Sequence, residues 1–224
     1  SAVQFLSGFR CDLAAIGDFC RQRGILFVVD GIQGVGAVRS DVQEIQADLL
    51  AVGGHKWRGS MQGAGFVAGS PHLMERVRPL RGWLNGPVAW DDFERVGLEL
   101  HPDATRFHVG TFPTAALYAL DAAVGVLLDV GPEQIENAVL ATSRQLAAGM
   151  DRLGVERVLD GEPQSGIVTV RVDEPAPMHQ ALMDRRLVCS LRSRLLRFAP
   201  HAWTSPAEID AALAVVEEVL PVAA

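Results

Sequence analysis

Apolar residues in the first third of the chain are spaced as in alternating helices and strands. Residues 12–24 carry apolar side chains at helical spacing, with Asp12 as an N-cap and Gly24 as a stop. Residues 25–29 then form a continuous apolar run that ends at Asp30. Such a run after a helix indicates a strand buried on both faces of a parallel sheet. The start of the chain therefore predicts an α/β fold.

The pattern continues with short elements and then stops. Strands are predicted over residues 48–52 and 65–68, and a helix over residues 71–77. Residues 79–112 follow neither period, and a loop this long in a compact domain is more often functional than idle. Its aromatic residues are candidates for lining a pocket or for ordinary packing: Trp83, Trp90 and Phe93.

Regular elements resume in the second half as a mixed set of helices and strands. They are helices over 114–128 and 132–153, a strand over 167–172, a helix over 178–186, strands over 187–191 and 195–198, and a helix over 206–220. We place a domain boundary near Gly131, which separates residues 1–131 from a smaller α/β unit of residues 132–224.

Composition and charge fit an ordinary soluble globular protein, with 49% hydrophobic residues, 21% charged residues and a formal net charge of −7. An acidic chain without a basic face is a poor candidate for binding nucleic acid. No apolar run approaches the length of a membrane span, and the N-terminus lacks the pattern of a signal peptide. The cysteines Cys11, Cys20 and Cys189 form neither a disulfide framework nor a zinc spacing, so we expect a cytoplasmic protein without a bound metal.

Polar side chains follow two of the predicted strands at the points where they end. Asp30 and Gln33 follow the first strand, and His55 and Lys56 follow the second. In open α/β sheets, ligands bind outside the carboxyl ends of the strands. The sequence therefore predicts a site where a carboxylate, an amide, an imidazole and an amine converge.

Lys56 is the only lysine of the chain, and every other basic residue apart from histidine is an arginine. A lone loop lysine is ordinarily a solvated surface residue. An amine that forms a Schiff base instead needs a fixed position and a depressed pKa. The single lysine beside His55 favours this second explanation. Asp30 is explained either as a turn-capping residue or as the partner of a protonated pyridine nitrogen. His55 is either a structural histidine or a donor to a bound phosphate.

The segment VVDGIQGVGAVRSDVQEIQADLLAVGGHKWRGSMQGAGF resembles the core of class V aminotransferases. This group of fold type I enzymes uses pyridoxal 5'-phosphate (PLP) and includes cysteine desulfurases, kynureninases and isopenicillin-N-epimerase-like proteins. The matching features are Asp-x-x-Gln after one apolar strand, His-Lys-Trp after a second, and a Gly-x-Gly turn seven residues past the lysine. The resemblance implies that residues 1–131 are the C-terminal part of a large, mainly parallel-sheet PLP-binding domain. Residues 132–224 would be the small C-terminal α/β domain.

The resemblance also implies roles for the four clustered residues. Lys56 would form the Schiff base with PLP and transfer protons. Asp30 would pair with the pyridinium nitrogen, and Gln33 would hydrogen-bond the ring hydroxyl. His55 would help to hold the phosphate.

Three residues further along the chain receive roles from the same resemblance. Thr111, which ends a Gly-Thr segment, would reach the phosphate bound by a partner subunit and so implies a homodimer. Arg192 lies in a strand similar to the one whose arginine binds the carboxylate of an amino-acid substrate, a role that suits the bidentate guanidinium. Arg197 lies in a segment similar to the strand that follows. The alternative explanation for both arginines is a solvated strand face.

The chain also departs from the family. Gly54 stands where a serine often precedes His-Lys, and Ser60-Met61 replaces the usual Gly-Pro. No cysteine follows Cys189, which argues against the cysteine desulfurase reaction, and the arginine strand followed by Pro-His is closest to the epimerase-like subgroup. The N-terminal portion of the family, with its phosphate-binding loop and its ring-stacking aromatic residue, has no counterpart here.

Two hypotheses follow for function. In the first, the chain is part of a PLP-dependent enzyme that acts on an amino acid by transfer, epimerisation or β-elimination, and the sequence does not select among these reactions. In the second, it is a truncated, non-catalytic paralogue that serves as a dimerisation or scaffold module. A general α/β binding protein without PLP is a third possibility, but it leaves the single lysine unexplained.

Overall fold

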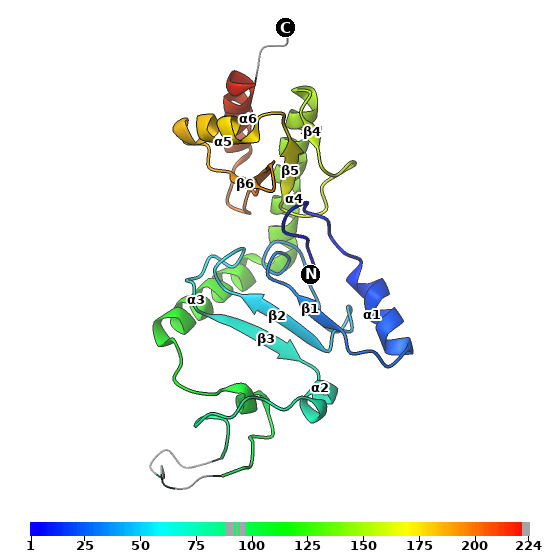
Figure 1. Ribbon diagram of the computed structural model, residues 1–224, viewed down its shortest axis with the longest axis vertical. Helices are drawn as coiled ribbons and strands as arrows, with labels where there is room; N and C mark the ends of the chain where they lie inside the picture. Colours follow the sequence, from blue (N-terminus) through cyan, green and yellow to red (C-terminus); the bar gives the residue numbers. More distant parts are fainter. Residues whose placement is uncertain (88–91, 93, 95–96, 221–224) are drawn as a thin grey trace.

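The computed structural model describes all residues except 88–91, 93, 95–96 and 221–224. The molecule is elongated, with a three-stranded sheet in one unit and a four-stranded sheet in the other (Figure 1). Helix α4 (Pro132–Arg152) runs from the first unit into the second. The described residues therefore form an α/β protein, as the sequence predicted.

The first sheet has the order β1-β2-β3, formed by β1 (Val28–Asp30), β2 (Leu49–Gly53) and β3 (Gly65–Gly69). β1 and β2 are parallel, and β3 is antiparallel to β2. Asp30 lies opposite Ala51 in the parallel pair. The carboxyl ends of β1 and β2 consequently meet at the same edge of the sheet.

The two faces of this sheet differ in their burial. Val29, Leu50 and Val52 point to the covered face and belong to one buried cluster. The opposite face carries Val28 and Val67, which are 58% and 54% exposed. The prediction that residues 25–29 are buried on both faces is therefore wrong, because the described part of the chain covers one face of β1 and leaves the other open. A continuous apolar run could not distinguish these two cases.

Helix α1 (Leu13–Gln22) begins as predicted, because the Asp12 carboxylate accepts a hydrogen bond from the backbone N–H of Ala15 at 3.0 Å. A Cβ atom at Gly17 would lie 2.1 Å from the carbonyl oxygen of Ile45. The small residue therefore lets α1 lie directly against the turn that precedes β2.

The segment 79–112 is irregular, as predicted. Its described residues contain one short helix, the 3-10 helix η1 (Ala104–Phe107), and the N–H of Trp83 donates to the carbonyl of Val109 at 3.1 Å. Trp90 and Phe93 lie outside the described residues.

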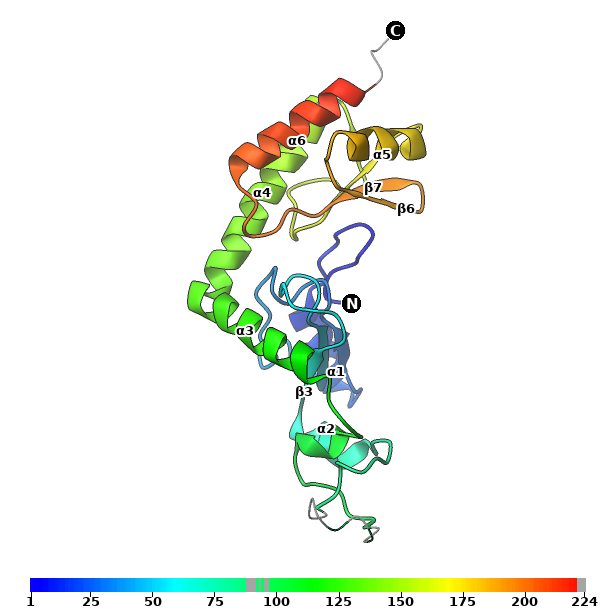
Figure 2. The same cartoon turned by 90° about the vertical axis from the view of Figure 1, so that its left-hand side faces the viewer.

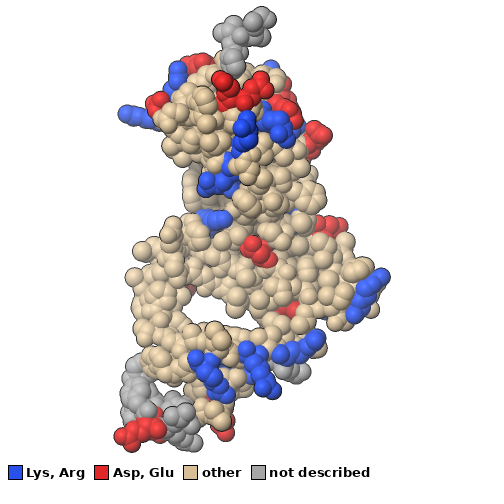
Figure 3. Space-filling model, viewed as in Figure 1, with Lys and Arg blue, Asp and Glu red and all other residues tan. Residues whose placement is uncertain are grey.

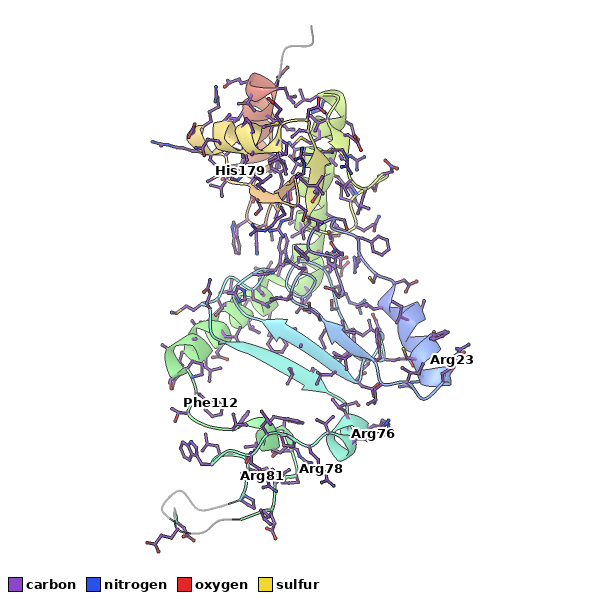
Figure 4. All side chains as sticks on the ribbon, in the orientation of Figure 1. Arg23, Arg76, Arg78, Arg81, Phe112 and His179 are labelled. Carbon is purple, nitrogen blue, oxygen red and sulfur yellow. The ribbon has the colours of Figure 1, made fainter. Side chains whose placement is uncertain are left out.

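Helix α2 (Pro71–Arg76) leads into the irregular segment. Arginines lie along this stretch at the lower edge of the molecule, where Figure 4 labels Arg76, Arg78 and Arg81. Figure 3 shows basic side chains along the same edge and an opening between this region and the sheet, whereas acidic and basic residues are mixed over the second unit. The absence of nucleic-acid binding stays a prediction.

The second sheet is antiparallel throughout and has the order β4-β5-β7-β6. Its strands are β4 (Glu156–Arg157), β5 (Val168–Arg171), β6 (Ser190–Arg192) and β7 (Leu195–Phe198). The sequence predicted the last three, with shifted bounds for β6, and missed the two-residue strand β4. Helix α6 (Pro206–Val219) packs against α4 and against helix α5 (Pro175–Asp184), while α4 and α5 contact strands of this sheet (Figure 2).

The second unit has its own buried core, to which α4, α5, α6 and the sheet all contribute. Its fully buried members include Met150, Leu182, Leu196 and Val216. Helix α6 begins at a capping box, in which Ser205 and Glu208 bond each other's backbone N–H groups.

The N-terminal residues connect the two units. Residues 3–10 form a hairpin closed by a bridge between Val3 and Arg10. The Thr169 hydroxyl donates to the carbonyl of Leu6 at 2.6 Å, and the Ser165 hydroxyl donates to the carbonyl of Gly8 at 2.7 Å. The hairpin thus lies against β5 of the second unit.

Helix α3 (Thr114–Val130) and α4 meet at Gly131, where φ is +96° and the two axes differ by 84°. In the part of the chain that the structure describes, no single helix is long and apolar enough to cross a membrane. Helices α3 and α4 reach the length and apolar composition of a membrane span only when they are taken together, as this bent pair. The domain boundary at residue 131 stays a prediction.

Truncating the core of the second unit tests its contribution to stability. Leu196→Ala removes a fully buried side chain from the sheet, so we expect the free energy of unfolding to fall by about 2–5 kcal/mol. Val188→Ala is the matched control, because Val188 is exposed, and it should change stability by about 0.5 kcal/mol or less. Urea denaturation measures both, and equal effects would contradict the assigned core.

Candidate active site

The four residues predicted to cluster lie on the turns that follow β1 and β2. Asp30 and Gln33 belong to the first turn, and His55 and Lys56 belong to the second. The parallel pairing of the strands brings these turns together, and the N–H of Gly31 donates to the carbonyl of Ala51 at 2.8 Å.

Asp30 caps the turn that follows β1, which is one of the two explanations that the sequence allowed for this residue. Its Oδ1 atom accepts a hydrogen bond from the backbone N–H of Ile32 at 2.9 Å. The side chain is exposed and lies on the open face of the sheet. The carboxylate therefore holds its own turn while remaining accessible to a ligand.

Gln33 is buried, with 4% of its surface exposed. Its Oε1 atom accepts a hydrogen bond from the indole N–H of Trp57 at 3.1 Å. Its side chain thus joins the first turn to the second.

Glycine closes the turn that carries Lys56. The N–H of Gly54 donates to the carbonyl of Ala64 at 2.8 Å, and the N–H of Gly59 donates to the carbonyl of Lys56 at 2.9 Å. A Cβ atom at Gly54 would lie 3.0 Å from the Ala64 oxygen and 3.1 Å from Leu120. This crowding explains why glycine, in place of the serine common in the family, fits here.

Arg58 was not anticipated from the sequence, yet it holds both turns. Its buried guanidinium donates to the carbonyl oxygens of Val35, Ile32 and Gly53. Burial lowers the pKa of Arg58 to about 10, and the charge of Asp30 opposes this shift. No local pattern in the sequence signals these contacts, which join residues of two separate turns.

The surroundings of Lys56 lower the pKa of its amine. Burial lowers this pKa most, and the positive charge of Arg197 lowers it further. The carboxylate of Asp30 raises it, and Arg58 adds a smaller lowering. The net direction favours the neutral amine, which is the nucleophilic form. Arg197 and Asp30 are therefore both electrostatic neighbours of Lys56.

His55 is exposed beside the lysine. Its Cε1 atom lies 3.3 Å from the position that a Cβ atom would occupy on Gly53. The imidazole therefore lies over the carboxyl end of β2. Its predicted contact with a phosphate stays a prediction.

The second unit reaches this turn through His201. The Nε2 atom of His201 lies 3.0 Å from the carbonyl oxygen of Trp57. The imidazole stacks between two indoles, with ring centroids 3.3 Å from Trp203 and 5.3 Å from Trp57. The sequence placed His201 after a predicted strand but gave no sign of this contact.

Thr111 and Arg192 lie outside the cluster. Thr111 is exposed on the segment that leads into α3, beside Phe112 (Figure 4). Arg192 is exposed at the end of β6, where its guanidinium donates to the carbonyl of Leu191. Arg197 on β7 is half-buried and donates to the carbonyl of Phe5 at 2.8 Å. Of the two arginines, Arg197 is the one whose charge acts on Lys56.

The donor set around Lys56 fits the ring of PLP. It contains a primary amine that would suit the aldehyde, a carboxylate at Asp30 that would suit the ring nitrogen and an amide at Gln33 that would suit the ring oxygen. A phosphate needs cations or free backbone N–H groups, and His55 is the exposed candidate that these two turns supply. Among the described residues, no group of three or more His, Cys, Asp or Glu side chains could hold a metal ion.

Comparisons with known proteins identify the family. The profile of the family Aminotransferase class-V matches residues 1–187. The uncharacterized aminotransferase YcbU of Bacillus subtilis is 25% identical over 94% of this chain and 56% of its own length. A probable cysteine desulfurase of Pyrococcus abyssi is 26% identical over 98% of this chain and 59% of its own length.

Solved structures agree with the fold. The complex between the cystine C-S lyase C-DES and its reaction product cysteine persulfide has a TM-score of 0.90 at 24% identity, over 98% of this chain and 60% of that one. A C-DES variant has glycine covalently linked to its PLP cofactor, with a TM-score of 0.89.

The chain belongs to the class V aminotransferase family. The prediction of the fold type I architecture of PLP-dependent enzymes is confirmed by these structures, and PLP is the cofactor that agrees with the family. The chain spans 56–60% of the length of the relatives named above.

The contact between the units should make stability depend on pH. Burial lowers the pKa of His201 from its ordinary value of 6.5, and the hydrogen bond to Trp57 opposes this shift. The folded chain therefore binds this proton less tightly than the unfolded chain. His201 contributes stability above pH 6.5, and this contribution is lost as the pH falls below that value.

We expect the free energy of unfolding of His201→Gln to depend less on pH than that of the unsubstituted chain around pH 6.5. Urea denaturation at a series of pH values measures this difference. His72→Gln, at an exposed position, is the control and should keep the original pH dependence. The same pH dependence in His201→Gln and in the unsubstituted chain would contradict the assignment.

Proposed function

We propose that the chain is the part of a PLP-dependent enzyme, acting on an amino acid, that supplies the covalent lysine. The observation that carries this proposal is the position of Lys56. The only lysine of the chain lies where two parallel strands end, with a lowered pKa and with Asp30 on the neighbouring turn. The family of the chain and the PLP-linked glycine of the C-DES variant support it.

Each residue of the site has a definite task in this proposal. The amine of Lys56 would hold PLP at its aldehyde, and the same amine would move the proton at the α-carbon of the substrate. Asp30 holds a proton on the ring nitrogen, and Gln33 bonds the ring oxygen. PLP supplies an electron sink for the negative charge that develops at the α-carbon.

The carboxylate of an amino-acid substrate needs a cation near Lys56. We propose Arg197 for this role, because its charge acts on Lys56 and its Nε atom is buried without a hydrogen-bond partner. Burial lowers the pKa of Arg197 most, and the positive charge of Arg192 lowers it further. Arg192 therefore lies close enough to assist Arg197 in binding the carboxylate. An arginine fork matches a carboxylate with two parallel hydrogen bonds.

The state of Cys189 bears on the type of reaction. Burial raises the pKa of its thiol to about 11, so the thiol is protonated at neutral pH and is a poor nucleophile. This favours transfer, epimerisation or elimination over a desulfuration that uses an enzyme cysteine. Cys11, Cys20 and Cys189 are unpaired, which supports the proposed cytoplasmic location.

Reductive trapping tests the covalent role of Lys56. The chain is incubated with PLP and reduced with borohydride, and the modified peptide is identified by mass spectrometry. We expect one side-chain adduct, on Lys56, because the chain has no other lysine. Lys56→Arg keeps the positive charge but removes the primary amine, so the side-chain adduct should be lost completely.

Peptide mapping separates Lys56 from the amine of Ser1, which serves as the internal control for nonspecific reaction with the aldehyde. Modification of Lys56 no faster than that of Ser1 would contradict the proposal. That result would favour the alternative of a non-catalytic paralogue.

We further propose that the chain forms a homodimer through α3. The helix is apolar, yet Ala116 and Leu120 are the buried members among its described residues. Large apolar side chains are exposed along it: Leu117, Tyr118, Val126, Leu128 and Val130. A contiguous exposed apolar surface marks an interaction site. Thr111 leads into this helix, so a dimer at α3 would bring it toward the partner's cofactor.

Sedimentation velocity tests the dimer. Tyr118→Asp places a charge on the α3 surface, where Tyr118 is 73% exposed, and should raise the dimer dissociation constant by about tenfold or more. Leu80→Asp is the control, because Leu80 is exposed but lies outside α3, and it should leave the constant unchanged. A chain that is monomeric at every concentration would contradict the dimer.

A further inference from the structure

Trp57, the residue after the proposed covalent lysine, is held at its indole N–H and at its backbone carbonyl. Its indole N–H donates to Oε1 of Gln33 at 3.1 Å. Its backbone carbonyl lies 3.0 Å from Nε2 of His201. Trp57 therefore connects the turn after β1, the turn after β2 and the second unit.

The indole contact determines which end of the Gln33 amide is available. A side-chain amide has an oxygen that accepts and an NH₂ group that donates. The indole N–H can only donate, so its partner must be the amide oxygen. This leaves the NH₂ group of Gln33 as the end that can serve a ligand, which fixes the side chain as a donor toward a ligand oxygen.

The indole has little freedom to leave this position. It is 5% exposed and belongs to a buried cluster with Val139 and Ile167. A Cβ atom at Gly166 would lie 2.3 Å from the indole Cη2 atom, so the second unit comes into direct contact with the ring. The packing therefore holds the N–H toward Gln33.

His201 holds the backbone of Trp57 as a neutral imidazole of defined tautomer. Its Nδ1 atom accepts from the N–H of Ala202 at 2.8 Å, so that nitrogen carries no proton. Its Nε2 atom must then carry the proton that it donates to the Trp57 carbonyl. The tautomer follows from these two contacts.

We propose that Trp57 is a positioning residue, which fixes the Gln33 amide as a hydrogen-bond donor to the ring oxygen of PLP and is itself held by His201. The inference rests on the proposed function, since it assigns a task to a side chain that does not touch the cofactor. Its consequence is that the second unit helps to set the electronic state of the cofactor through Trp57.

The first experiment needs no cofactor. In the ¹⁵N-labelled chain, the indole N–H signal of Trp57 is assigned by its disappearance in Trp57→Phe, and its exchange with solvent is measured. Gln33→Met removes the acceptor and keeps an unbranched side chain, so exchange should become about tenfold faster, as expected for the loss of one hydrogen bond. Gln62→Met, at an exposed position, is the control and should leave the rate unchanged. An equal rate in the unsubstituted chain and in Gln33→Met would overturn the inference.

The second experiment follows the visible absorption of the PLP adduct as a function of pH. A donor to the ring oxygen stabilises its negative charge and so lowers the pKa of the adduct. Trp57→Phe removes the N–H and leaves the amide free to turn, which should raise this pKa by about 0.5–1 unit, the effect of one net hydrogen bond. Gln33→Met should give a similar rise. Trp203→Phe is the matched control and should give none, because phenylalanine keeps an aromatic ring that can stack on His201.

The outcomes separate the inference from the function on which it rests. An adduct pKa that is the same in the unsubstituted chain, Trp57→Phe and Gln33→Met contradicts the inference alone. A chain that forms no adduct at Lys56 contradicts the proposed function and, with it, the role of the amide. Lower affinity for PLP without a change in the adduct pKa would mean that Trp57 is only structural, and would also overturn the inference. If Trp57→Phe does not fold, the indole exchange rate and the adduct pKa of Gln33→Met test the inference.

Discussion

The parallel pairing of β1 with β2 is the constraint on which the candidate site depends. It places Asp30 opposite Ala51 and so brings the turns that follow both strands to one edge of the sheet. Because side chains alternate between the faces of a strand, a shift of one residue would turn Asp30 toward the covered face. The register thus decides whether the charge of the carboxylate can act on the lysine.

Two buried side chains keep the turns in this arrangement. Arg58 satisfies carbonyl oxygens of both turns, and Trp57 joins them through Gln33. An isolated charge is costly to bury, and the hydrogen bonds of Arg58 offset that cost. The same guanidinium acts on the pKa of Lys56, so a residue that supports the turns also favours the reactive form of the amine.

The sequence predicted the features that depend on local chemistry. Asp12 caps the first helix as expected, the last helix begins at Pro206 as predicted, and the order of the main helices and strands was correct. The clustering of Asp30, Gln33, His55 and Lys56 also followed, because parallel strands bring their carboxyl ends together. Periodicity alone could not show that one face of β1 stays open, since a run of apolar residues looks the same in both cases.

Contacts between residues far apart in the sequence could not be predicted from the sequence alone. His201 and Trp57 are separated by 144 positions, and neither has a neighbour that signals the other. Arg192 was favoured for the substrate because of the strand in which it lies, whereas Arg197 is the arginine whose charge acts on Lys56. Which of two nearby arginines faces a site depends on tertiary packing, and local spacing does not encode it.

The course of α4 has a mechanical consequence. Its first turns contribute Ile135 and Val139 to the cluster that holds Trp57, and its later turns contribute Leu146 and Met150 to the core of the second unit. One continuous helix shared by two cores leaves no hinge between them. A swing of the second unit would have to bend the helix or pull Val139 away from Trp57.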